Sequence, residues 1–170
     1  AIFAEIKGTK YEVPISLAAL GLRRSEICAL TLEDLDGNVL TINKAIVQDK
    51  EKKWVIKTTK TTDSTRTIVI PDALADLIRK QGYIYDGCPE LIYRTLSNIQ
   101  KKLGIPHFSL HKMRHFFVSY MHDLGYSDKQ IQEFGGWKTD IVMKTVYQHA
   151  MDMDEAKKKM AGSIGSLFPS

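Results

Sequence analysis

The side chains best suited to chemistry in this 170-residue chain are cations, imidazoles and a tyrosine, spread over five short elements. In chain order the elements are Gly21-Leu22-Arg23-Arg24-Ser25-Glu26, Lys60-Thr61 followed by Arg66, His111-Lys112-Met113-Arg114-His115, Gly136-Trp137, and Tyr147. Guanidinium groups suit phosphate because they stay charged and present a planar fork of donors. Such residue types fit phosphoryl transfer, which needs in-line attack and stabilisation of charge on the non-bridging oxygens.

Helical periodicity brings two of these side chains together. At about 100° per residue, a helix over 110–124 places His111 and Arg114 about 60° apart, so both could point into one cleft. One apolar face of this helix is expected to hold it to the core; its members are Met113, Phe116, Phe117, Tyr120, Met121 and Leu124.

The remaining patterns predict one mainly α domain of the α+β class, with a small sheet inserted early. A helix over 16–20 ends at Gly21, as glycine commonly follows a helix end, and a second short helix comes next. After the Asp36-Gly37 turn, the runs 39–47, 54–58 and 66–70 predict a three-stranded antiparallel meander. Further helices are expected at 72–80, 89–103, 110–124, 127–134, 139–150 and 152–161.

The composition limits which partners, cysteine-based sites and locations are expected for the chain. A net charge of +4 and a pI near 9.0 suit a polyanionic partner without requiring one. Cys28 and Cys88 lie far apart and form no Cys-x-x-Cys unit, so neither a disulfide framework nor a zinc knuckle is expected, and an intracellular location is the default. No apolar run approaches the roughly 18 residues of a membrane span, and no membrane partner is expected.

In their order and spacing, the five elements resemble the tyrosine recombinase family of phage and transposon integrases. That family combines an Arg-x-x-Glu box, a hairpin lysine, a His-x-x-Arg box, a Gly followed by His or Trp, and a nucleophilic Tyr about ten residues later. Trp137 precedes Tyr147 by ten residues here. The resemblance implies a tyrosine recombinase catalytic domain over residues 1–170. Its tail, 151–170, would pack on a neighbouring subunit or form a solvated helix, and we expect no preceding DNA-binding domain in this chain.

The resemblance also implies roles for the first and last elements. Tyr147 is the nucleophile, and Arg23 and Arg114 clamp the phosphate. Glu26 orients Arg23, although a solvated helix carboxylate remains an alternative. Arg24 is expected to be an ordinary surface charge.

The other positions are assigned in the same way. His111 donates to the phosphate or relays a proton, His115 is structural, and the indole N–H of Trp137 positions the phosphate. Lys60 protonates the leaving 5′ oxygen, with Lys57 as its rival. The two histidines lack a third ligand, so no metal is expected, and neither is any cofactor.

The implied function is site-specific DNA recombination through a 3′-phosphotyrosyl intermediate, for the integration or excision of a mobile element. The expected partners are double-stranded DNA, further copies of the chain in a tetramer, and accessory DNA-bending or excision factors. The expected place of action is the cytoplasm of a bacterium, at the nucleoid. A type IB topoisomerase-like enzyme and a non-catalytic DNA-binding module are the alternatives.

Overall fold

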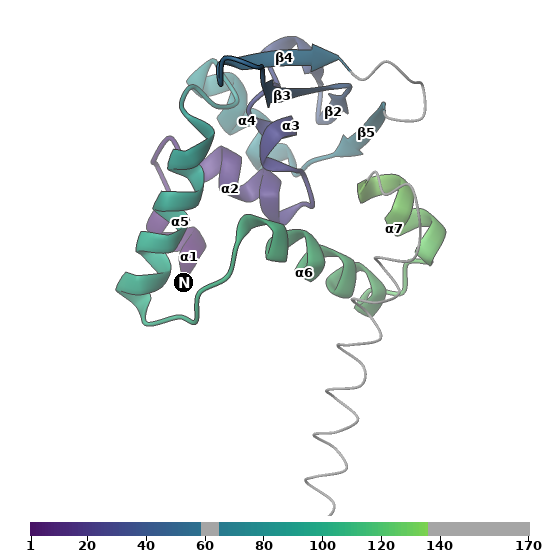
Figure 1. The fold of residues 1–170 in the computed structure, drawn as a ribbon. Coiled ribbons are helices and arrows are strands. Elements are labelled where there is room, and N and C mark those ends of the chain that lie inside the picture. Colours follow the sequence, from purple (N-terminus) through teal and green to yellow (C-terminus); the bar gives the residue numbers. More distant parts are fainter. Residues whose placement is uncertain (59–64, 136–170) are drawn as a thin grey trace, which may run out of the picture.

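The structure, a computed structural model, describes residues 1–58 and 65–135. The helices are α1 (Ile2–Ile6), α2 (Glu12–Ala19), α3 (Arg24–Ile27), the 3-10 turn η1 (Leu32–Asp34), α4 (Asp72–Gln81), α5 (Pro89–Leu103), α6 (Leu110–Asp123) and α7 (Asp128–Gly135). The strands are β1 (Leu35–Asp36), β2 (Val39–Ile42), β3 (Lys44–Gln48), β4 (Trp54–Thr58) and β5 (Arg66–Val69). Figure 1 shows the strands gathered at one end of a helical body. The predicted α+β class is confirmed.

Helix α2 lies at the centre of this body. It contacts α1, α3, α4, α5 and α6, and its residues Val13, Ile15, Leu17 and Ala18 are buried. A helix that is apolar on every side must be covered on every side, which explains why this short segment organises its neighbours. The same core contains side chains from the sheet and from the later helices, among them Leu40, Ile42, Ile78, Ile92 and Leu96.

The strand pairing differs from the predicted meander. The run 39–47 is divided at Asn43 into β2 and β3, which join different sheets. A three-stranded antiparallel sheet is present, but its order is β1-β2-β5, with Ile42 opposite Arg66; β3 and β4 form a separate pair. The meander was wrong because alternation determines which face a residue takes, whereas the pairing partner depends on contacts distant in the sequence.

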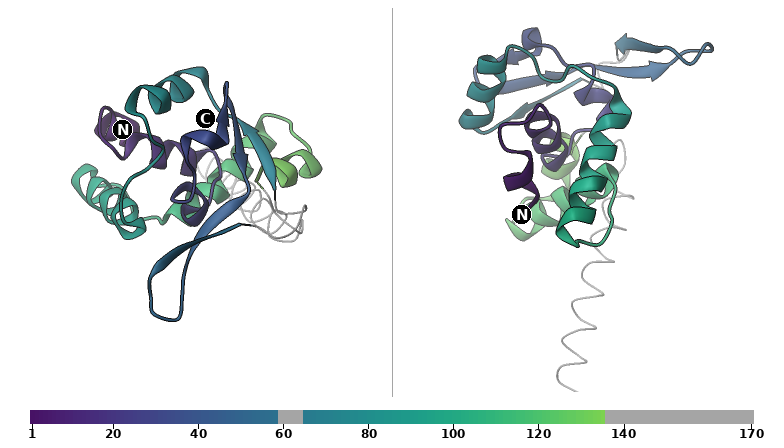
Figure 2. Two further views of the ribbon diagram at one scale, coloured as in Figure 1. Left: turned by 90° about the horizontal axis from the view of Figure 1, so that it is seen from above. Right: turned by 90° about the vertical axis from the view of Figure 1, so that its left-hand side faces the viewer.

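The β3–β4 pair is a hairpin that projects from the body (Figure 2). Its β4 side chains Trp54, Ile56 and Lys57 are exposed. Strand β3 nevertheless packs against α3, so the base of the hairpin is anchored beside the helix that follows Arg23.

Helix α6 packs differently from the prediction. Its buried residues are Leu110, Met113, Arg114, Phe117 and Val118. Exposed side chains form a stripe along a neighbouring face; these are Phe116, Tyr120 and Leu124. The predicted apolar face was therefore only half right. The buried face of the helix includes Arg114 and leaves Phe116 exposed.

No helix within residues 1–58 and 65–135 has both the length and the apolarity needed to cross a bilayer. The predicted helices at 139–150 and 152–161, and the proposed tail at 151–170, lie outside the described residues.

Candidate active site

The site begins at the sharp turn between α2 and α3. Gly21 has a φ of +91°, which L side chains rarely adopt. A Cβ on Gly21 would also lie 2.9 Å from Cδ1 of Phe117 on α6. Glycine is thus required here twice over, by its backbone conformation and by the close approach of α6. The turn brings Arg23, directly before α3, against the part of α6 that carries Arg114.

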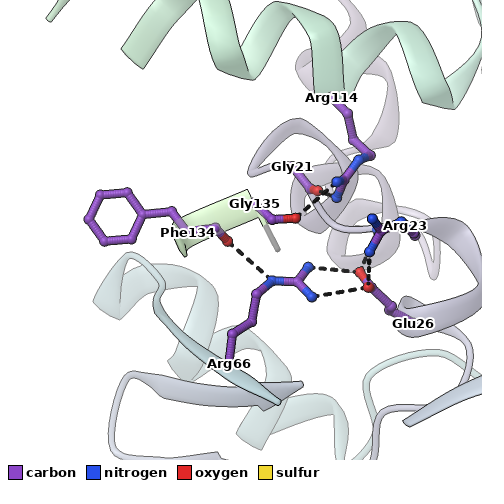
Figure 3. Close-up of polar contacts among 7 residues, drawn as sticks. All are labelled: Gly21, Arg23, Glu26, Arg66, Arg114, Phe134 and Gly135. Carbon is purple, nitrogen blue, oxygen red and sulfur yellow. Dashed lines mark hydrogen bonds and ion pairs between the residues drawn. The ribbon is translucent and has the colours of Figure 1, made fainter. Parts of the chain in front are cut away.

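Glu26 joins two arginines in this region (Figure 3). Its Oε1 accepts from Nη1 of Arg23 at 2.8 Å, and its Oε2 accepts from the Arg23 backbone N–H at 2.8 Å. Arg66 of β5 approaches the same carboxylate with two N–H groups, at 3.0 and 2.9 Å. Glu26 is buried. It is therefore a buried partner of Arg23 and not a solvated helix carboxylate.

Arg114 is 2% exposed and ties three segments together. Its Nη1 donates to the carbonyl of Gly21, and its Nη2 donates to the carbonyl of Gly135 at 2.9 Å. Arg66 makes a parallel contact, because its Nε donates to the carbonyl of Phe134 at 3.2 Å. Two guanidiniums thus hold the carboxyl end of α7, as Figure 3 shows.

Three guanidiniums gather about one carboxylate in the part of the chain that the structure describes. Arg23 and Arg66 bond to Glu26, and Arg114 lies close enough to be influenced by its charge. Burial, and next the positive charge of Arg23, lowers the pKa of Arg114 to about 9, while Glu26 acts in the opposite direction. Burial raises the pKa of Glu26, but the hydrogen bonds and charge of Arg66 outweigh it and hold that pKa below 4.5. A bound anion would relieve the repulsion among the guanidiniums.

The histidines lie on the exposed side of α6. The ring centroids of His111 and His115 are 4.7 Å apart, edge to face. Burial, followed by the charge of His111, lowers the pKa of His115 below its ordinary value. Within the described ranges, no group of three or more His, Cys, Asp or Glu side chains could hold a metal ion.

These elements enclose a cleft of about 440 Å³. It lies between α3, α5 and the start of α6, and its lining includes three predicted site residues, Arg23, His111 and Arg114. The other lining residues are Leu22, Arg24, Ser25, Tyr93, Ser109 and Leu110. His111 and Arg114 thus reach one cleft, as the helical projection predicts.

Three predicted site residues, Lys60, Trp137 and Tyr147, lie outside the described residues. The rival lysine, Lys57, is exposed on β4. The sequence reasoning assigned no role to Arg66, although Arg66 ended the lysine motif and that motif was the available signal.

The sequence is similar to that of a known protein family. The sequence profile of the phage integrase family matches residues 13–153, which is more than half of the chain. The chain belongs to the phage integrase family. The family's tyrosine recombinases are enzymes that cleave and rejoin DNA, so the resemblance inferred from the five elements is confirmed.

Individual relatives of this family member are distant. A XerC-like tyrosine recombinase of Caldanaerobacter subterraneus subsp. tengcongensis is 22% identical over 96% of this chain and 51% of its own length. The transposase of transposon Tn916 from Enterococcus faecalis is 24% identical over 88% of this chain and 44% of its own length. The chain therefore spans about half the length of the curated relatives it matches.

Solved structures of integrases share the fold. The Tn1549 transposon integrase, in complex with transposon right-end DNA, superposes with a TM-score of 0.73 at 22% identity, over 94% of this chain and 62% of that one. The XerA recombinase gives 0.68 at 16% identity, over 94% of this chain and 61% of that one. These likenesses support the mainly helical fold with its small antiparallel sheet.

Proposed function

We propose that this chain is the catalytic domain of a site-specific recombinase that integrates or excises a mobile DNA element. The observation that carries the proposal is the cleft that Arg23, His111 and Arg114 share, although 90 residues lie between the two arginines in the sequence. The guanidiniums of Arg23, Arg24 and Arg114 line this cleft, and such groups suit a phosphodiester far better than a neutral ligand.

The proposed reaction exchanges one phosphodiester for another. The phenolic oxygen of Tyr147 attacks phosphorus in line, a P–O bond to tyrosine forms, and the P–O5′ bond breaks. Arg23, His111 and Arg114 stabilise the charge on the non-bridging oxygens, and the indole N–H of Trp137 adds a contact. The ammonium of Lys60 gives its proton to the departing 5′ oxygen, and the phenol proton passes to solvent. A 5′-hydroxyl from another strand then reverses these steps and rejoins the backbone.

The carboxyl end of α7 supports the assignment of Trp137 and Tyr147. Arg66 and Arg114 hold the carbonyls of Phe134 and Gly135, so the chain continues toward both residues from a point fixed beside the cleft. Glu26, itself held by Arg66, positions Arg23, and the ring of His115 packs edge to face against that of His111.

The wider assembly belongs to the same proposal. A recombinase must bring several cleavage sites together, so we infer that the chain assembles as a tetramer on double-stranded DNA, with residues 151–170 packing between subunits. Accessory DNA-bending or excision factors would set the direction of recombination. The bacterial cytoplasm, where such DNA lies, is the proposed place of action.

Covalent trapping tests the proposal. Wild-type protein is mixed with a random-sequence library of nicked duplexes, in which the short 5′-hydroxyl fragment diffuses away after cleavage. We expect a protein–DNA adduct that survives detergent, and sequencing the trapped DNA would give the target site. Tyr147→Phe should form no adduct while it retains DNA binding.

Three further results would change the conclusion. An adduct formed by Tyr147→Phe would move the nucleophile to another residue. Trapping by wild type without strand exchange between two duplexes would indicate relaxation of the topoisomerase type, and binding with no adduct at all would indicate a non-catalytic module.

A further inference from the structure

The lining of the cleft includes a tyrosine that the proposed reaction does not use. Tyr93 lies on α5, is 41% exposed, and lines the cleft. Arg24 and Ser25 at the start of α3, together with Ser109 before α6, line the same cleft. Outside the Arg23–His111–Arg114 set, the cleft lining therefore offers one guanidinium and three hydroxyl groups.

Tyr93 is held by a chain of hydrogen bonds that ends in the protein interior. Its hydroxyl lies 3.1 Å from Nε2 of His107, and the two rings meet edge to face with centroids 5.8 Å apart. Nδ1 of His107 lies 3.0 Å from Oε1 of Gln100. Gln100 is 1% exposed, and its Nε2 donates to the carbonyl of Phe108 at 2.9 Å.

The direction of each hydrogen bond follows from the backbone. The carbonyl of Phe108 can only accept, so the Gln100 side chain must place its NH₂ there and its oxygen toward His107. Nδ1 of His107 must then carry the hydrogen, which leaves Nε2 of the neutral ring as an acceptor for the Tyr93 hydroxyl. The buried amide thus fixes the imidazole, and the imidazole fixes the phenol ring.

We propose that Tyr93 and Arg24 form a second phosphate contact in the cleft, next to the phosphate that is cleaved, and that His107 and Gln100 position Tyr93. On binding, the Tyr93 O–H turns from His107 to a phosphate oxygen. Because His107 is exposed, water can then donate to its Nε2, so no buried acceptor is left unpaired. This inference rests on the proposed function, since it assumes that a DNA backbone occupies the cleft.

Binding and cleavage are measured separately to test it. Affinity is read by fluorescence anisotropy with a short labelled duplex of random sequence, since phosphate contacts do not depend on sequence. Cleavage is read as adduct formation on nicked duplexes at saturating protein. Tyr93→Phe removes only the hydroxyl, and we expect affinity to fall about tenfold, as for a lost hydrogen bond to a charged group. Adduct formation at saturation should be unchanged.

Companion variants separate contact from positioning. Arg24→Gln should reduce the slope of log affinity against log salt by about 0.9, the value for one phosphate. His107→Ala should weaken binding nearly as much as Tyr93→Phe, and His107→Gln, which keeps an acceptor, should restore part of the loss. Tyr83→Phe is the matched control, because Tyr83 is 38% exposed but does not line the cleft.

The outcomes are distinct. Unchanged affinity in Tyr93→Phe overturns the inference. If adduct formation at saturation falls while affinity is unchanged, Tyr93 acts in the cleavage step and not as a second phosphate contact. If wild type forms no adduct, the proposed recombinase activity fails, yet the anisotropy comparison still decides whether Tyr93 contacts DNA.

Discussion

The carboxylate of Glu26 holds two guanidiniums that arrive from different parts of the chain, Arg23 next to it and Arg66 from β5. The Arg66–Glu26 pair is buried on both sides, with 8% side-chain exposure each. Removing one partner of such a pair is costly because it leaves an uncompensated buried charge. Glu26 therefore contributes to stability as well as to the position of Arg23.

Replacing the Glu26 carboxylate should change both the stability of the fold and the rate of cleavage. We expect Glu26→Gln to lower the free energy of unfolding by about 3 kcal/mol, read from urea denaturation. Adduct formation should also fall, since Arg23 loses its anchor. Glu33→Gln, at an exposed position in η1, is the matched control and should change neither quantity. Equal stability of the two variants would show that Arg66 finds another partner.

The same pair predicts a dependence on pH. The pKa of Glu26 is held below its ordinary value of 4.5, so the folded state favours the ionised form. Its stabilisation is fully present above about pH 4.5 and is lost as pH falls through the folded-state pKa. The stability difference between wild type and Glu26→Gln should thus be constant from neutral pH down to about pH 5 and shrink on further acidification. A difference that grows in acid would contradict the ion-pair account.

At the scale of elements, the sequence predicted most helices closely but not what they touch. The helix ends at Ala19, Gln81 and Leu103 are each followed within two residues by a glycine, and such signals are local. The pairing of β2 with β5 and the burial of Arg66 depend on residues far apart in sequence. Periodicity likewise could not tell that α6 buries Arg114 and exposes Phe116, because a helical projection contains no information about the neighbouring surface.

The turn between α2 and α3 gives a prediction at this scale. Gly21→Ala introduces a Cβ at a φ of +91° and within 2.9 Å of the Phe117 ring. The backbone conformation alone costs about 1–3 kcal/mol, and the ring must also move. We expect reduced stability and a larger loss of cleavage, because the Gly21 carbonyl is a partner of Arg114. Gly8→Ala is the control: its φ is also positive, but nothing lies within 4 Å of the added Cβ.

Helix α7 is attached by a small apolar contact. Val118 and Ile131 form a cluster separate from the main core, with Met121 packed against it. We expect Ile131→Ala to loosen α7 and weaken the hold of Arg66 and Arg114 on its carboxyl end, so adduct formation falls. Ile78→Ala, in the main core, should instead lower the unfolding free energy by about 2–5 kcal/mol. If Ile131→Ala were fully active, the position of α7 would not matter for cleavage.

At the scale of the whole molecule, the projecting hairpin carries lysines outside the cleft. The loop between β3 and β4 contains Lys50, Lys52 and Lys53, all exposed, together with Asp49 and Glu51, and Lys53 pairs with Glu51 at 2.8 Å. Strand β3 packs on α3 beside the cleft. Figure 2 shows the hairpin reaching well beyond the body. A DNA duplex whose backbone enters the cleft would extend past the anchored end of the hairpin. We therefore expect the three lysines to contact phosphates at a distance from the cleaved bond.

Salt dependence measures that contact directly. Each phosphate neutralised contributes about 0.9 to the slope of log affinity against log salt. Replacing Lys50, Lys52 and Lys53 together by Gln should therefore reduce the slope by up to about 2.7, if each contacts one phosphate. A control with Gln at Lys7, Lys10 and Lys80 removes the same charge from exposed positions in the turn after α1 and on α4. Because net charge falls equally in both triple variants, an equal loss of slope would indicate general attraction between the protein and DNA, and only a selective loss in the hairpin variant would show that the duplex lies along it.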